Sequence, residues 1–179
     1  MTAQTQANWT DEDETAILNA IDKWVEGEVR PIAREHDQAD SYPHELTEQM
    51  KELGLFGAII SPNYGGLGLP ASTYAKIVLK VAAAWMAPSG IFNSHLIMAS
   101  AIERTGTEEQ KAEWLPKMAT GELRGGIALT EPNAGTDLQA IRTKAEKTNE
   151  GYRLNGTKTW ITNSLHGNCL MILTKTDTD

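Results

Sequence analysis

The stretch "ALTEPNAGTD", residues 128–137, lies just after the point near Gly121 at which the sequence changes character. Before that point apolar residues recur at helical spacing, and after it short β-prone segments alternate with turns. The stretch begins apolar and becomes a loop with two hydroxyls and two carboxylates, and it contains no Lys, Arg, His or Cys. We therefore expect an α+β chain with a loop that offers hydrogen-bonding groups but no evident base or nucleophile.

The N-terminal two thirds of the chain predict five helices. Thr10 and Thr107 each precede, by three positions, a residue whose side chain can complete a helix N-terminal cap. Pro31 should bend or interrupt the first helix because proline lacks the N–H that a helix needs, and Gly54 should end the second. Apolar residues at three- and four-residue steps place the helices near residues 10–33, 46–53, 74–85, 88–102 and 107–118.

The C-terminal third predicts about four strands, with turns at 149–151 and at Asn155-Gly156. So few strands leave open edges, which favour aggregation when they are apolar. A further stretch of chain or a second chain should therefore complete this part. The strand segments are "GGIALT" (125–130), "IRTKAEK" (141–147), "YRLNGTKTWITN" (152–163) and "CLMILTKT" (169–176).

The composition disfavours nucleic-acid-binding, disulfide-bonded and membrane-spanning proteins. The chain has 179 residues, 40% of them hydrophobic, and a net charge of −8. The acidic balance disfavours nucleic acid as a partner. Cys169 is the single cysteine, so an internal disulfide is impossible, which fits a reducing compartment. The sequence has neither a signal-peptide pattern nor an apolar run of about 18 residues, so we expect no membrane span and a cytoplasmic location.

Familiar catalytic and metal motifs do not account for this sequence. The four histidines and the cysteine lack metal-ligand spacing, so no metal is expected, and His95 is best interpreted as a core residue. Neither a phosphate-binding loop, a dinucleotide fingerprint nor a serine-hydrolase elbow occurs in its required context. If "KTWITNS", residues 158–164, forms a strand, Trp160 and Thr162 share one face that suits a flat heteroaromatic ring. An ordinary turn with a buried tryptophan explains the same residues equally well.

Four segments resemble the acyl-CoA dehydrogenase family of flavoproteins. "ALTEPNAGTD", continued by Leu138, Gln139 and Ala140, resembles the family signature, and "NGTKTWITNS" (155–164) resembles its second flavin segment. "GTEEQKAEWLPKMATGE" (106–122) and "SPNYGGLG" (61–68) resemble the helix before the signature and a glycine loop. The resemblance implies an all-α N-terminal domain, here 1–120, and an antiparallel β-barrel domain, of which 121–179 would be an incomplete first part. It also implies a C-terminal four-helix domain that these residues do not include.

The family's cofactor is FAD, and the resemblance assigns residues to it. Leu129 and Thr130 would bond the pyrimidine edge of the flavin, Trp160 would pack on the ring, and Thr162 would lie near flavin N5. Thr136 stands where the family often has serine, near the substrate thioester and pantetheine. The full set of implied cofactor-binding residues is Ile127, Leu129, Thr130, Gly135, Thr136, Trp160, Ile161 and Thr162.

The resemblance implies α,β-dehydrogenation of an acyl-CoA thioester, an oxidoreductase reaction of fatty acid metabolism with hydride transfer to flavin N5. The family's catalytic glutamate belongs to the C-terminal domain, so no catalytic residue is assigned here. Glu131 is expected to be structural. These 179 residues alone should therefore be inactive. Electron-transfer flavoprotein is the implied electron acceptor, and a homo-oligomer, a dimer or homotetramer, the implied assembly. The resemblance implies that the helix near residues 88–102 lines the acyl pocket, and because no Lys or Arg lies between Lys80 and Arg104, an uncharged acyl chain is favoured. An acyl-CoA oxidase, a flavin monooxygenase or a non-catalytic assembly subunit of the same fold remain alternatives.

Overall fold

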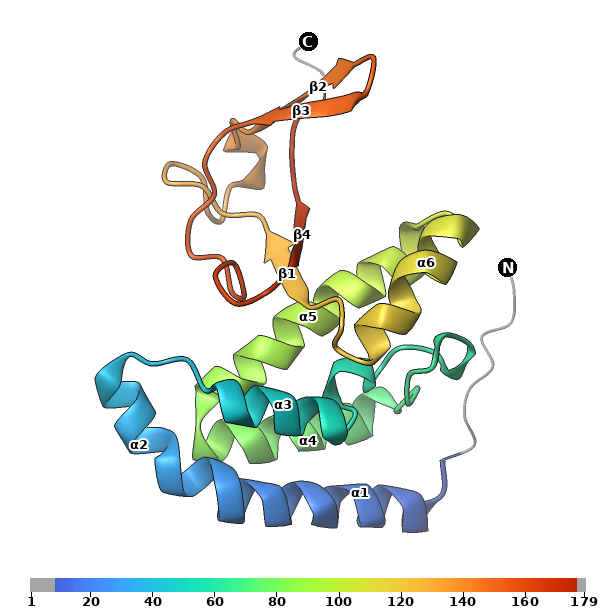
Figure 1. Ribbon diagram of the computed structural model, residues 1–179, viewed down its shortest axis with the longest axis vertical. Coiled ribbons are helices and arrows are strands. Elements are labelled where there is room, and N and C mark those ends of the chain that lie inside the picture. The colour runs from blue at the N-terminus through green and yellow to red at the C-terminus, as the bar shows by residue number, and fades with distance from the viewer. Residues whose placement is uncertain (1–8, 177–179) are drawn as a thin grey trace.

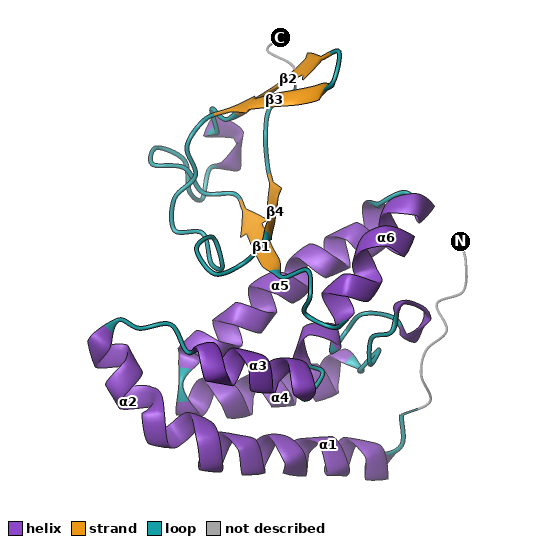
Figure 2. Ribbon diagram, viewed as in Figure 1, coloured by secondary structure: helices purple, strands orange, loops and turns teal. Residues whose placement is uncertain are grey.

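A helical part of the chain carries a smaller β part in the computed structural model, which describes residues 9–176 (Figures 1 and 2). The β part rests on helix α5, which crosses the middle of the molecule (Figure 1). The helices are α1 (Asp11–Trp24), α2 (Arg30–Ala39), α3 (His44–Glu52), α4 (Ala71–Ala84), α5 (Met86–Thr105) and α6 (Glu108–Ala119). The strands are β1 (Gly125–Ala128), β2 (Lys144–Thr148), β3 (Gly151–Asn155) and β4 (Cys169–Ile172).

The predicted helix ends and the predicted bend are present. The Thr10 side chain accepts a hydrogen bond from the Asp13 N–H, and the Asp13 carboxylate accepts one from the Thr10 N–H. Pro31 lies in the first turn of α2, and the preceding residues Val25–Val29 form a π-helical segment. Because Pro31 cannot donate a backbone hydrogen bond, the regular helix is interrupted here, and α2 leaves α1 at an angle (Figure 1).

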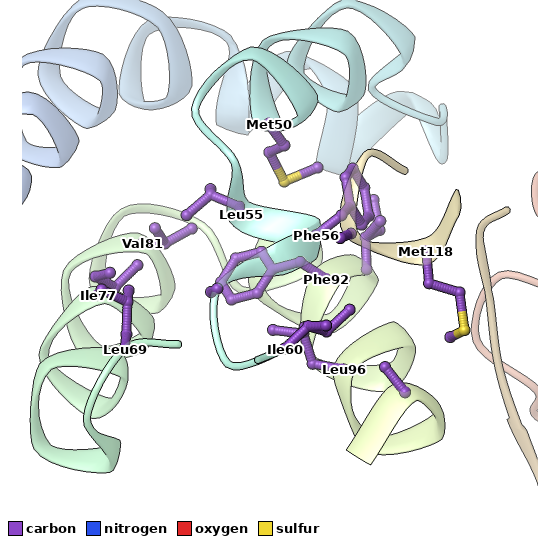
Figure 3. Close-up of a cluster of buried hydrophobic side chains, with 14 of the residues drawn as sticks. Met50, Leu55, Phe56, Ile60, Leu69, Ile77, Val81, Phe92, Leu96 and Met118 are labelled. Atoms are coloured by element: carbon purple, nitrogen blue, oxygen red, sulfur yellow. The ribbon is translucent and has the colours of Figure 1, made fainter. Parts of the chain in front are cut away.

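The hydrophobic core takes buried residues from α1, α3, α4, α5 and α6, and Figure 3 shows one cluster of it. Gly54 ends α3 in a left-handed conformation with φ of 70°, and the chain then turns Leu55 and Phe56 inward. Phe56 and Phe92 have no exposed surface, and burying a side chain of this size stabilises the fold by about 2–3 kcal/mol. This core packs around α5, against which strand β1 lies.

The expected antiparallel barrel is not confirmed. Within residues 9–176 the strands form two pairs: β2 and β3 make an antiparallel hairpin, whereas β1 and β4 pair in parallel. Antiparallel pairing was therefore wrong for β1 and β4. The chain between these two strands contains the whole β2–β3 hairpin and returns to β1 in the same direction, and that crossover makes the pair parallel.

The expected strand through "KTWITNS" is also wrong. Between the end of β3 and the start of β4 the chain forms no strand: residues 156–161 are irregular and residues 162–166 form a turn. Trp160 and Asn163 have φ of 59° and 67°, which are left-handed values that a strand does not contain. Trp160 and Thr162 therefore do not share the face of a strand, and a feature outside the local sequence must hold Trp160 and Asn163 in this conformation.

Candidate functional site

One hollow of about 300 Å³ gathers most of the residues assigned to the cofactor. Strand β1 and the loop after it supply Ile127, Leu129 and Thr130, and the segment between β3 and β4 supplies Trp160, Ile161 and Thr162. Helix α5 supplies the remaining wall with Gly90, Asn93, Ser94 and Ile97. Gly135 and Thr136 do not line the hollow and are exposed on the turn that follows. The roles of all eight residues stay predictions.

The first segment leaves strand β1 and turns sharply. Ala128 is buried, and its carbonyl accepts a hydrogen bond from the Leu173 N–H at 3.0 Å. Three residues later Glu131 and Ala134 exchange two backbone hydrogen bonds, of 2.8 and 3.1 Å. These bonds close the turn, so Leu129 and Thr130 are held at the rim of the hollow between a strand and a tight loop.

The second segment is fastened to α5 and to β1. The Asn163 side chain is buried, and its Nδ2 donates to the Ile91 carbonyl at 2.9 Å and to the Gly125 carbonyl at 2.7 Å. A Cβ added at Gly126 would lie 2.5 Å from Ser94 Oγ and 2.8 Å from the Thr162 carbonyl oxygen. Glycine is therefore required where helix, strand and loop meet, and this contact places Thr162 beside α5.

The indole of Trp160 is 90% exposed although it borders the hollow. A large aromatic side chain in a left-handed conformation is costly, and here burial in the core offsets none of that cost. Such a residue is expected where an aromatic surface is needed for a ligand.

The chemistry of the hollow suits an uncharged flat ring with hydrogen-bonding edges. Its polar groups are the hydroxyls of Thr130, Thr162 and Ser94 and the Asn93 amide, and none of the described side chains that line it is ionised at neutral pH. The Tyr74 hydroxyl donates to Asn93 Oδ1 at 2.8 Å, which orients this amide. Neutral donors with an exposed indole fit the isoalloxazine ring of a flavin.

Glu131 is buried and bonded locally, as expected of a structural residue. Its two carboxylate oxygens accept the Arg142 N–H at 2.6 Å and the Thr143 N–H at 2.9 Å. The adjacent Thr143 side chain, these two backbone N–H groups and the Lys158 ammonium together lower the pKa of Glu131 from 4.5 to about 2. A carboxylate of such low basicity is unsuited to removing a proton from carbon.

His95 belongs to the core, which agrees with the interpretation from sequence. Its side chain has no exposed surface, its Nε2 lies 3.1 Å from the Met118 carbonyl oxygen, and its ring meets Phe56 edge-on at 5.2 Å. Burial lowers the pKa of His95 from 6.5 to about 4, so the imidazole is neutral.

In residues 9–176, no three His, Cys, Asp or Glu side chains gather as metal ligands, and no helix has the length and apolar character to cross a membrane.

Sequence reasoning assigned no α5 residue to the cofactor and missed the contacts of Lys158. Asn93 and Ser94 are adjacent polar residues that lie, together with His95, between the apolar pairs Ile91-Phe92 and Leu96-Ile97, which was the available signal for the wall. Lys158 lies within the quoted segment, but its buried partner is 27 positions away, so no local pattern revealed its contacts.

Comparisons with known proteins agree with the geometry. The sequence model described as "Acyl-CoA dehydrogenase, N-terminal domain" matches residues 11–122, and that described as "Acyl-CoA dehydrogenase, middle domain" matches residues 126–179. Mitochondrial isovaleryl-CoA dehydrogenase of Bos taurus is 32% identical over 173 residues, which cover 95% of this chain and 41% of that protein.

Two solved structures show the same arrangement. Butyryl-CoA dehydrogenase of Megasphaera elsdenii superposes with a TM-score of 0.86 at 31% identity, covering 96% of this chain and 46% of that one. A glutaryl-CoA dehydrogenase of Mycobacterium smegmatis in complex with FADH2 superposes with a TM-score of 0.86 at 30% identity, covering 94% and 44%. The chain thus spans less than half the length of each of these relatives.

Proposed function

Because this chain belongs to the acyl-CoA dehydrogenase family, we propose that it forms the flavin-facing part of an FAD-dependent acyl-CoA dehydrogenase. When bound, FAD would supply the redox chemistry by accepting a hydride from the β-carbon of an acyl-CoA thioester. The observation that carries this proposal is the hollow in which six of the eight assigned residues meet one face of α5. Residues 1–120 would form the helical domain, and 121–179 part of the β domain.

The proposed roles follow from position around the hollow. Leu129 and Thr130 would hold the pyrimidine edge of the ring, Trp160 would pack on it, and the Thr162 hydroxyl would lie near N5. Gly135 and Thr136 lie farther along the loop, which suits contacts with the pyrophosphate and, for Thr136, with the thioester end of the substrate. Electron-transfer flavoprotein as the acceptor and a homo-oligomeric assembly belong to the same proposal.

The base that removes the α-proton is proposed to lie outside residues 1–179. Among residues 9–176, Glu131 is the one buried carboxylate, and its two oxygens already accept hydrogen bonds from Arg142, Thr143 and Lys158. We expect these 179 residues alone not to oxidise acyl-CoA. Stoichiometric bleaching of bound flavin by an acyl-CoA in this preparation would contradict that expectation.

The α5 wall supports an uncharged acyl chain. We propose that α5 also lines the acyl pocket next to the flavin. Its residues Gly90, Asn93, Ser94 and Ile97 offer no cation, so a second carboxylate on the acyl chain would be desolvated without a counter-ion. The enzyme should therefore turn over a neutral acyl-CoA faster than glutaryl-CoA. Faster turnover of glutaryl-CoA would refute this specificity.

The proposal is tested by titrating the complete protein that contains these residues with FAD and recording the visible spectrum. We expect a bound flavin with a structured absorption band, and weakening of binding by about two- to tenfold in Trp160→Ala, the range for loss of one aromatic contact. Leu79→Ala is the matched control because Leu79 is 70% exposed on α4, away from the hollow. Absence of FAD binding, or equal losses in both variants, would refute the site. Fast reaction of the reduced flavin with oxygen would instead indicate an oxidase or monooxygenase.

A further inference from the structure

The side chain of Lys158 is largely buried between the two segments that border the hollow. Its side chain is 10% exposed and that of Glu131 is 7% exposed. The Lys158 ammonium donates to the Leu129 carbonyl at 2.8 Å and to Glu131 Oε1 at 3.0 Å. A buried lysine is costly unless it is paired, so this contact is specific to the folded arrangement of the two segments.

The Lys158–Glu131 pair connects three parts of the chain, namely residue 158, residues 129–131 and residues 142–143. Lys158 belongs to the second segment, Leu129 and Glu131 belong to the first, and the Glu131 carboxylate also accepts the N–H groups of Arg142 and Thr143. Next to it, the Thr159 N–H donates to the Thr130 carbonyl at 2.9 Å. The two segments are therefore held by a charged contact and a neighbouring backbone contact.

The hydrogen bond from Lys158 to the Leu129 carbonyl also determines the direction in which the Thr130 N–H points. In a trans peptide the C=O of one residue and the N–H of the following residue point in opposite directions. The Leu129 carbonyl points to Lys158, which does not line the hollow, so the Thr130 N–H points away from Lys158. Among the described residues this N–H makes no backbone hydrogen bond, while Thr130 itself borders the hollow.

We propose that Lys158 and Glu131 are positioning residues that fix the Leu129–Thr130 peptide so that the Thr130 N–H is presented to the ligand of the hollow. The inference rests on the proposed flavin site. It assigns to the pair no contact with the cofactor and no proton transfer. Its effect is on the orientation of one backbone donor and on the distance between the two segments.

The first measurement uses the unaltered chain and amide hydrogen exchange followed by NMR. Without FAD, the Thr159 amide should be protected and the Thr130 amide should exchange freely, and saturation with FAD should protect Thr130. A Thr130 amide that is already protected without FAD, or one that stays unprotected when FAD is bound, would overturn the proposal. This measurement does not depend on whether any variant folds.

The second measurement is a double-mutant cycle with Lys158→Met and Glu131→Gln. Each single variant should speed exchange at Thr159 and weaken FAD binding by about tenfold or more, as expected for loss of a charge-assisted hydrogen bond. The double variant should lose less than the product of the single losses because the two groups act as one unit. Lys80→Met is the control, since Lys80 pairs with Asp22 at 2.7 Å on the helical surface and should change neither quantity.

The outcomes separate this inference from the proposed function. Unchanged exchange at Thr159 in Lys158→Met, or independent losses in the double variant, would overturn the positioning role even if FAD binds normally. A chain that never binds FAD would refute the proposed cofactor and with it the presentation of the Thr130 N–H. Faster exchange with unchanged FAD affinity would show that the pair holds the loops but does not position the donor.

Discussion

Asn163 is the residue whose replacement should most clearly uncouple the second segment from the rest of the molecule. Its Nδ2 donates two hydrogen bonds, to the Ile91 carbonyl in α5 and to the Gly125 carbonyl at the start of β1. Its backbone is left-handed, with φ of 67°. Substitution therefore changes two separable quantities, the side-chain hydrogen bonds and the backbone preference.

The expected losses follow from these two quantities. Asn163→Gly removes both hydrogen bonds, at about 1 kcal/mol each, so the free energy of unfolding should fall by about 2 kcal/mol. Asn163→Ala removes the same bonds and adds about 1 kcal/mol because alanine disfavours the left-handed conformation, for a total of about 3 kcal/mol. Asn163→Asp would direct a carboxylate at two carbonyl oxygens and should destabilise the protein at least as much as alanine.

The assay is urea unfolding followed by far-UV circular dichroism, with Asn149→Ala in the exposed β2–β3 turn as the control. The control should change the free energy of unfolding by less than about 0.5 kcal/mol. Stability should decrease in the order wild type, glycine variant, alanine variant. An alanine variant within about 0.5 kcal/mol of wild type, or one more stable than the glycine variant, would refute the reasoning.

Three further predictions concern pH and strand packing. The pKa of His95 is lowered from 6.5 to about 4, so between these pH values the unfolded chain binds a proton that the folded chain does not. The free energy of unfolding should therefore fall by about 3 kcal/mol as the pH falls from above 6.5 to 4. His95→Gln should remove this slope from urea midpoints measured across that range. The pKa of Glu131 is lowered from 4.5 to about 2, so its contribution is complete above pH 4.5 and is lost as the pH falls toward 2. Glu131→Gln should flatten the acid side of the same profile. Gly125→Ala would drive a methyl group into the Cys169 carbonyl and should lower thermal stability by about 1–3 kcal/mol, whereas Gly27→Ala, which meets open space, should not destabilise the protein.

Local chemistry in the sequence determined the helical part and several turns. The caps at Thr10 and Thr107, the interruption before Pro31 and the stop at Gly54 each depend on groups a few residues apart. The β2–β3 hairpin is equally local, with its turn where 149–151 predicted it. Such signals can be recognised in the sequence because the interacting atoms are neighbours along the chain.

Only the tertiary structure decided how the two segments that border the hollow are arranged. The left-handed conformations of Trp160 and Asn163 contradict the β propensity of "TWIT" because the Asn163 side chain bonds carbonyls 72 and 38 positions away. The parallel pairing of β1 with β4 and the contact of Lys158 with Glu131 likewise join distant residues. The sequence alone identified the segments and their family resemblance. Their geometry around the hollow depends on long-range hydrogen bonds and burial, whose energies outweigh local backbone preferences of about 1 kcal/mol.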